Sequence, residues 1–313
     1  MEMAIERQKQ ARAKGTVANK QSSIKEYLKY TYENNIHPFQ ITTLEFCAFI
    51  ESMIIRGISP ATVRNKVSHI RSWMNLARAD MAEVYDKRVT MHMEAYDKTK
   101  IYTSRVKDAV PIWILKQVIT SFPNDTWGWI IKTALLILAY GGFRQGEIMP
   151  QSRTSFDHMK HLVRGDVYLT ETNMHIKIKD GKNLAQYDKF RACVFARNPC
   201  ISMCVVHAIT NMFMLQPTKT EDQPLFINPE NGGPVTVTTL RNVWDQKVKS
   251  LGHDNKKFSL HSIRKTMSTV AYHAGVSELE IKSFGAWSSS AYKTYISTRA
   301  DISVNNALIN HYK

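Results

Sequence analysis

The sequence has little of what marks a secreted or membrane protein. Its four cysteines among 313 residues are too few for a disulfide framework. No apolar run reaches the roughly 18–20 residues that a membrane-spanning helix needs. The polar N-terminal stretch MEMAIERQKQARAKG is unlike a secretory signal peptide. These absences predict a soluble intracellular protein of a reducing compartment, with no membrane partner.

A full set of metal ligands is also missing. Cys200, Cys204 and His207 have a spacing that one helix could direct toward an ion, but no further ligand cluster accompanies them. The surrounding stretch CISMCVVHAITNMFML is apolar, which favours buried thiols in a core helix. We therefore predict no metal site. The sequence contains neither an internal repeat nor a low-complexity segment.

Acidic residues are scarce beside basic ones: 27 Asp and Glu stand against 42 Lys and Arg, for a net charge of +15. The length allows two domains, and a hydrophobic content of 43% is ordinary for a globular protein. Basic residues occur in both halves of the chain. This distribution favours a long polyanion, a nucleic acid, held by both domains.

The N-terminal third predicts a small helical domain over residues 21–97, preceded by a basic tail over 1–20. Helix starts are predicted at Ser22-Ser23, at the Thr42-Thr43 cap and at Ser59-Pro60. A further helix is predicted over 80–97. Residues 98–108 lose periodicity and are predicted to form a basic linker.

One face of the helix that follows Ser59-Pro60 is basic. The residues on this face are Arg64, Lys66, Arg71 and Arg78. A solvated charged stripe is one interpretation. In so basic a chain we favour contact with DNA phosphates.

Residues 109–313 predict a second domain that is mainly helical and contains a small antiparallel β-sheet. Helices are predicted over 111–122, 127–140, 237–251 and 302–312, and from Cys200 onward. Short strands are predicted over 167–169, 174–179 and 191–195. The predicted fold class is therefore mainly α, with a small sheet in the C-terminal domain.

The second domain carries polar residues whose chemistry suits a phosphodiester. Arg144 follows a Gly-Gly turn, and Glu147 can reach back toward it. His261 and Arg264, spaced i, i+3, lie side by side on one helix face. Two guanidinium groups can bind the oxygens of one phosphate and stabilise a pentacoordinate transition state. His261 can act as a base.

Acid and nucleophile candidates complete this set. Lys182, at the tip of the turn Asp180-Gly181-Lys182-Asn183, can protonate a leaving 5′ oxygen. Lys177 and Lys179 are alternatives, because hairpin register decides which lysine faces the phosphate. Trp287 can donate a hydrogen bond through its indole N–H.

Two tyrosines are candidate nucleophiles, Tyr292 and Tyr295, which are i, i+3 neighbours. Any one of these residues taken alone could be structural: Arg144 paired with Glu147, His261 in a core, Trp287 or Tyr295 as a core aromatic. Their joint occurrence in this order favours catalysis.

The order of these residues resembles that of the tyrosine recombinases, the phage-integrase family. GGFRQGEI is similar to the family's first-arginine motif, HSIRKTMST to its second box, and CVVHAITNMF to its helix after the β-region. The stretch from Gly285 to Ala291, followed by Tyr295, resembles eukaryotic Crypton-type transposon recombinases. The resemblance covers roughly residues 105–300. Trp287 stands where most prokaryotic members have histidine, and the interval to Tyr295 is one residue shorter than usual.

The resemblance implies a C-shaped clamp on DNA and a catalytic set of Arg144, Lys182, His261, Arg264, Trp287 and Tyr295. Tyr295, favoured over Tyr292 by the Crypton-like pattern, would form a 3′-phosphotyrosyl bond without ATP, metal or other cofactor. A homotetramer on two DNA sites would exchange strands through a Holliday junction. The Crypton likeness alone implies a nuclear location. A type IB topoisomerase and a domesticated DNA-binding protein are the alternatives.

Overall fold

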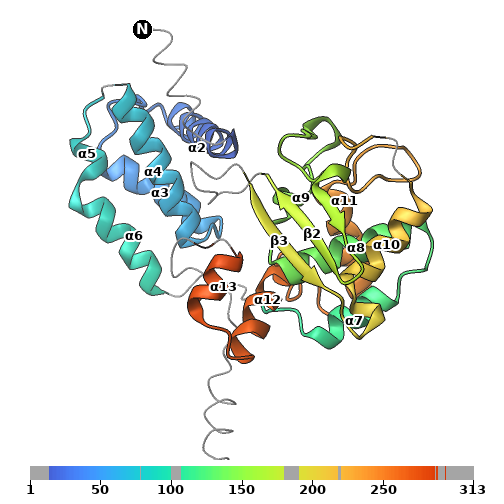
Figure 1. Ribbon diagram of the computed structural model, residues 1–313. Helices are drawn as coiled ribbons and strands as arrows, with labels where there is room; N and C mark the ends of the chain where they lie inside the picture. Colours follow the sequence, from blue (N-terminus) through green and yellow to red (C-terminus); the bar gives the residue numbers. More distant parts are fainter. Residues whose placement is uncertain are drawn as a thin grey trace, which may run out of the picture. The chain divides into compact units, whose positions relative to one another are not determined.

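The structure, a computed structural model, describes residues 14–77, 79–99, 107–179, 190–217, 220–285, 287 and 293. The chain divides into two compact units, Met1–Arg105 and Val106–Lys313. Unit 1 is helical in its described part, and unit 2 combines helices with a three-stranded antiparallel sheet (Figure 1). The predicted fold class, mainly α with a small antiparallel sheet, is confirmed.

Unit 1 packs its helices around one apolar core. The helices are α2 (Lys14–Glu33), α3 (Thr43–Ile55), α4 (Pro60–Leu76), α5 (Ala82–Tyr85) and α6 (Lys87–Thr99). Two predicted starts are confirmed: Thr42 caps α3 in a capping box with Glu45, and Ser59 caps α4 with Pro60 at its first position. Each start is encoded locally, because the capping side chain satisfies backbone N–H groups within three residues.

Two predictions for unit 1 are wrong. Helix α2 begins at Lys14, inside the predicted tail over 1–20. The predicted start at Ser22-Ser23 therefore lies inside the helix, where the Ser23 hydroxyl donates to the Asn19 carbonyl (2.9 Å) and lies 2.9 Å from Nδ1 of His69 on α4. The single helix predicted over 80–97 is broken at Asp86, whose backbone is extended and whose carboxylate accepts the Arg88 N–H at 2.7 Å. The predicted helix over 302–312 lies outside the described residues.

The sheet of unit 2 is a meander in the order β1-β2-β3, with strands β1 (Val167–Leu169), β2 (Asn173–Ile178) and β3 (Arg191–Ala196). Its register pairs Ile176 with Cys193. Alternate residues of β2, including Ile176, are buried, and those between them are more exposed. One face of the sheet therefore belongs to the core, as the period of two residues requires.

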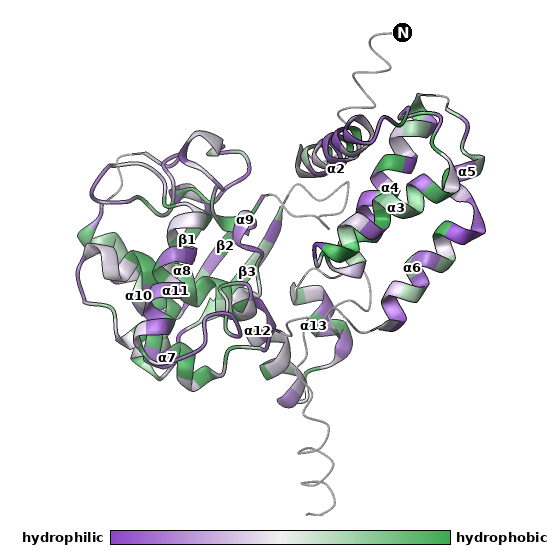
Figure 2. Cartoon of the chain, turned by 180° about the vertical axis from the view of Figure 1, so that it is seen from behind, coloured by the Kyte–Doolittle hydropathy of each residue, from purple (hydrophilic) through white to green (hydrophobic). Residues whose placement is uncertain are grey.

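The helices of unit 2 are α7 (Ile112–Thr120), α8 (Thr126–Gly141), α9 (Gln145–Ile148), α10 (Val205–Leu215), α11 (Val237–Ser250), α12 (Ser262–His273) and α13 (Glu278–Gly285). Helix α8 is buried along most of its length, and α10 and α12 pack against it. Short 3-10 turns occur at Arg153–Ser155, Arg164–Asp166 and Ile201–Met203. Figure 2 shows α8 as largely hydrophobic, in contrast to the hydrophilic α2.

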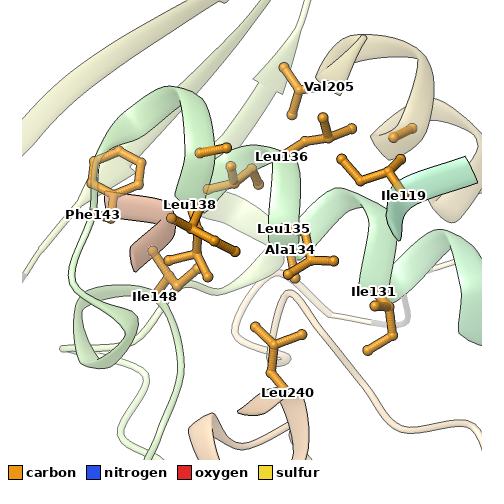
Figure 3. Close-up of a cluster of buried hydrophobic side chains, with 14 of the residues drawn as sticks. Ile119, Ile131, Ala134, Leu135, Leu136, Leu138, Phe143, Ile148, Val205 and Leu240 are labelled. Carbon is orange, nitrogen blue, oxygen red and sulfur yellow. The ribbon is translucent and has the colours of Figure 1, made fainter. Parts of the chain in front are cut away.

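The core of unit 2 holds the segment that carries Arg144. Figure 3 shows side chains of α8, among them Leu135 and Leu138, meeting Phe143, Ile148 and Leu240. Phe143 and Ile148 flank Arg144 and are each 1% exposed. Because both neighbours are anchored in the core, the backbone of Arg144 is fixed by packing. Among the described helices, none is long and apolar enough to cross a membrane.

Candidate active site

Arg144 and Glu147 form a closed turn at the end of α8. Gly142 adopts φ of +55°, a left-handed conformation that favours glycine, and ends the helix. Arg144 then caps α9. Its backbone N–H donates to Glu147 Oε2 at 2.8 Å and its Nη1 donates to Oε1 at 2.7 Å. The side chain of Glu147 is 8% exposed, so its carboxylate is a buried counter-charge. The expected reach of Glu147 toward Arg144 is confirmed.

Arg264 is the most deeply placed charge of the site, at 2% exposure. Its Nη1 donates to the Gly142 carbonyl and its Nη2 to the Gly285 carbonyl at 2.9 Å. Nη1 also lies 3.9 Å from Glu147 Oε2. One guanidinium thus joins α12 to the Gly-Gly turn and to the end of α13. Its direct contact with a phosphate stays a prediction.

Trp287 covers the guanidinium of Arg264. The ring lies 4.6 Å from Arg264 Cζ in a cation–π contact and the residue is 7% exposed. Residue 285 must be glycine for this arrangement, because a Cβ there would lie 1.6 Å from Trp287 Cζ3. The Gly-x-Trp motif therefore folds the indole back onto Arg264. The predicted contact of the indole N–H with a phosphate is not tested by this geometry.

His261 lies at the start of α12, where the residue reaches solvent although protein atoms surround much of its imidazole. Its pKa is lowered from the ordinary value, first by desolvation and then by the positive charges of Arg264, Lys107, Lys265 and Arg144. The imidazole is consequently neutral over more of the weakly acidic range than a free histidine. A neutral imidazole beside two arginines can accept a proton from a nucleophile while the arginines attract an anion.

The candidate lysines differ in what surrounds them. Lys179 donates to the His158 carbonyl at 2.5 Å and pairs with the buried carboxylate of Asp166 at 2.6 Å. This lysine fixes the loop before β1 to the end of β2, which argues against a role as proton donor. Lys177 is exposed and its Nζ lies 4.7 Å from the centre of the Phe190 ring. Lys182, Tyr292 and Tyr295 lie outside the described residues.

The basic stripe of α4 makes contacts within unit 1. Arg64 pairs with Asp97, and Lys66 with Glu26. Arg71 donates to the Val84 carbonyl at 2.9 Å and 2.6 Å and stacks on Tyr85 at 4.6 Å. Burial lowers the pKa of Arg71. Arg71 therefore fastens α5 to α4, a structural role beyond the predicted DNA contact. Arg78 lies outside the described residues.

Cys200 and Cys204, which were predicted to lie in one core helix, lie in different elements. Cys204 is buried and caps α10, its Sγ accepting the His207 N–H at 3.4 Å. Cys200 precedes the 3-10 turn before α10 and is half-buried, so the expectation of two thiols within one core helix is wrong. The described residues contain no group of three or more side chains suited to hold a metal ion.

The sequence did not predict that backbone carbonyl groups hold one of the arginines of the site. The carbonyls of Gly142 and Gly285 hold Arg264, although they lie 122 and 21 residues away. A signal existed for Gly285, since a glycine two residues before a tryptophan leaves room for the ring. No local pattern pointed to Arg264 as the shared partner of both glycines.

No protein-family model and no curated protein matches the sequence. Solved structures do match. A lambda integrase dimer bound to a COC′ core site is similar with a TM-score of 0.61 at 14% identity, over 96% of this chain and 96% of that one. The Tn1549 transposon integrase in complex with transposon right end DNA gives 0.64 at 12%, over 98% and 96%. The chain has the tyrosine recombinase fold.

A further structure with this fold is the XerH site-specific recombinase bound to its difH substrate. It matches with a TM-score of 0.55 at 17% identity, over 86% of this chain and 71% of that one. Each of these proteins was solved with DNA. At such low identity the tyrosine recombinase fold is what the likeness establishes, and roles of individual residues must come from the geometry of this chain.

Proposed function

We propose that the protein is a site-specific DNA recombinase that cleaves and rejoins DNA through Tyr295. The observation that carries the proposal is the cluster in which Arg144 and Arg264 meet at Glu147, with His261 beside them. Such a cluster concentrates positive charge around one imidazole, which suits a phosphodiester undergoing attack. The tyrosine recombinase fold and the DNA complexes of its similar structures support this function.

In this proposal each residue has a separate task. Arg144, with part of its side chain accessible, binds the oxygens of the scissile phosphate. Arg264, held by two carbonyls and covered by Trp287, supplies a fixed charge behind it. His261 accepts the proton of the attacking tyrosine, whose ordinary pKa near 10 makes it a weak nucleophile without help. Lys182 protonates the departing 5′ oxygen.

The same proposal includes an assembly. Both units bind double-stranded DNA, and in unit 1 the residues that contact its phosphates are Arg64, Lys66, Arg71 and Arg78. Four copies on two sites exchange strands through a Holliday junction. The likeness of the Gly285–Ala291 stretch to Crypton-type recombinases supports a transposition role and, with it, a nuclear location.

Covalent capture tests this function. Wild type is incubated with a pool of nicked duplexes of randomised sequence, in which the loss of a short cleaved fragment prevents religation. Protein is then denatured in detergent and attached DNA is recovered and sequenced. We expect attached DNA that is enriched in one sequence for wild type, and none for Tyr295→Phe.

The alternatives give different outcomes. A wild-type protein that binds DNA but yields no covalent complex would indicate a DNA-binding protein that kept the fold. Attachment without sequence enrichment, together with relaxation of supercoiled DNA, would indicate a type IB topoisomerase. Capture that survives Tyr295→Phe and disappears in Tyr292→Phe would make Tyr292 the nucleophile.

A further inference from the structure

Residues 107–110, the segment that enters unit 2, are hydrogen-bonded to α12. The Val110 N–H donates to Thr266 Oγ1 at 3.1 Å, and this hydroxyl donates back to the Val110 carbonyl at 2.9 Å. Asp108 pairs with Lys257 at 3.2 Å. Val110 is 1% exposed and Thr266 2%, so this pair of hydrogen bonds is buried and fixes the position of the segment.

Lys107, the first residue of this segment, is held by a residue in the first turn of α12, close to His261. Lys265 follows His261 by four residues and so lies on the same helix face. Its Nζ donates to the Lys107 carbonyl at 2.5 Å. The Lys107 carbonyl is thereby held by the ammonium of a residue that follows His261 by one helical turn. The charge of Lys107 acts on His261 and also on Asp245 of α11.

The cations around His261 differ in whether their charged groups already have a hydrogen-bond or ion-pair partner. Arg144 is bound to Glu147, Arg264 to two carbonyls, and Lys265 to the Lys107 carbonyl. Lys107 is exposed, and within the described part of the chain its Nζ makes no hydrogen bond or ion pair. A solvated ammonium on a fixed backbone beside the phosphate-binding groups is suited to a second phosphate of the same strand.

We propose that Lys107 is a further phosphate-binding residue, whose ammonium contacts a DNA phosphate next to the one bound by Arg144 and Arg264. This inference rests on the proposed function, because it places DNA at His261. It gives residues 107–110 a direct part in positioning DNA at the site, with Thr266 and Lys265 as the residues that hold this segment in place.

The test is the salt dependence of DNA binding by the full chain. Fluorescence anisotropy with a labelled duplex of arbitrary sequence gives the affinity over a series of sodium chloride concentrations. Each phosphate contact contributes a slope of about 0.9 in log K against log salt. Lys107→Gln should reduce the slope by about that amount, which corresponds to roughly eightfold weaker binding at about 0.1 M salt.

Two controls separate phosphate contact from a change in structure. Lys107→Arg keeps the charge and should retain the wild-type slope. Lys116→Gln removes an exposed lysine of α7, and should also leave the slope unchanged. An NMR titration of the His261 ring gives a second readout: its pKa should rise in Lys107→Gln, with Arg264, Lys265 and Arg144 still present, and stay unchanged in Lys116→Gln.

A Lys107→Gln slope equal to that of wild type would overturn the inference, even if covalent capture succeeds and the proposed function stands. A reduced slope together with failed covalent capture would keep Lys107 as a phosphate contact and reject the recombinase. A wild-type chain without salt-dependent DNA affinity would reject both.

Discussion

Removal of the Glu147 charge should destabilise unit 2 far more than removal of an exposed carboxylate. Glu147 accepts two hydrogen bonds from Arg144 and lies 3.9 Å from Arg264, which is 2% exposed. Glu147→Gln keeps the shape and leaves a buried guanidinium without its counter-charge. Breaking a buried pair in this way costs about 3–5 kcal/mol. The glutamine can still accept the Arg144 N–H, so we expect a loss of about 3 kcal/mol in the free energy of unfolding.

The matched control is Glu278→Gln, which weakens the exposed i, i+4 pair with Lys282. This change should cost less than about 0.5 kcal/mol. Urea unfolding followed by tryptophan fluorescence measures both, because five of the six tryptophans belong to unit 2 and only Trp73 to unit 1. Equal midpoints for the two variants would refute the reasoning that Glu147 is the buried counter-charge of the arginines.

Two further predictions follow from the same geometry. Gly285→Ala should displace Trp287 and lower the free energy of unfolding by about 1–3 kcal/mol. The control Gly146→Ala should be neutral, because its added Cβ would meet only a side-chain amide at 3.5 Å. Thermal unfolding of the two variants measures the difference. The imidazole of His261 should titrate below its ordinary pKa of about 6.5, and salt should raise that pKa only partway because burial is its first cause. Since folded His261 then holds fewer protons than the unfolded chain, its contribution to stability increases with pH between the two pKa values. An NMR midpoint at or above the ordinary value would contradict this.

Elements with local signals were predictable from the sequence. The Thr42–Glu45 capping box, the Ser59-Pro60 start and the strand Val167–Leu169 depend on residues a few positions apart. The start of α2 at Lys14 was not predicted, since Ser22-Ser23 looks like a local cap; in the structure Ser23 instead contacts His69, 46 residues away. The structural role of Arg71 likewise depends on Val84, a partner on another helix.

The same division applies to the site. The Arg144–Glu147 pair could be predicted from a spacing of three residues. The burial of Arg264 could not, because it results from the turn at Gly142 and the end of α13 meeting on one guanidinium. The proposed role of Lys107 also depends on tertiary contacts, since Thr266 and Lys265, more than 150 residues away, hold its segment against α12.

The central claim is that a tyrosine of this chain becomes joined to DNA. Its most direct test is mass spectrometry of the peptide that stays attached to DNA after covalent capture and proteolysis. The account predicts one modified peptide, with the phosphodiester on the Tyr295 oxygen. A modification on another residue, or intact DNA that carries no peptide, would contradict it.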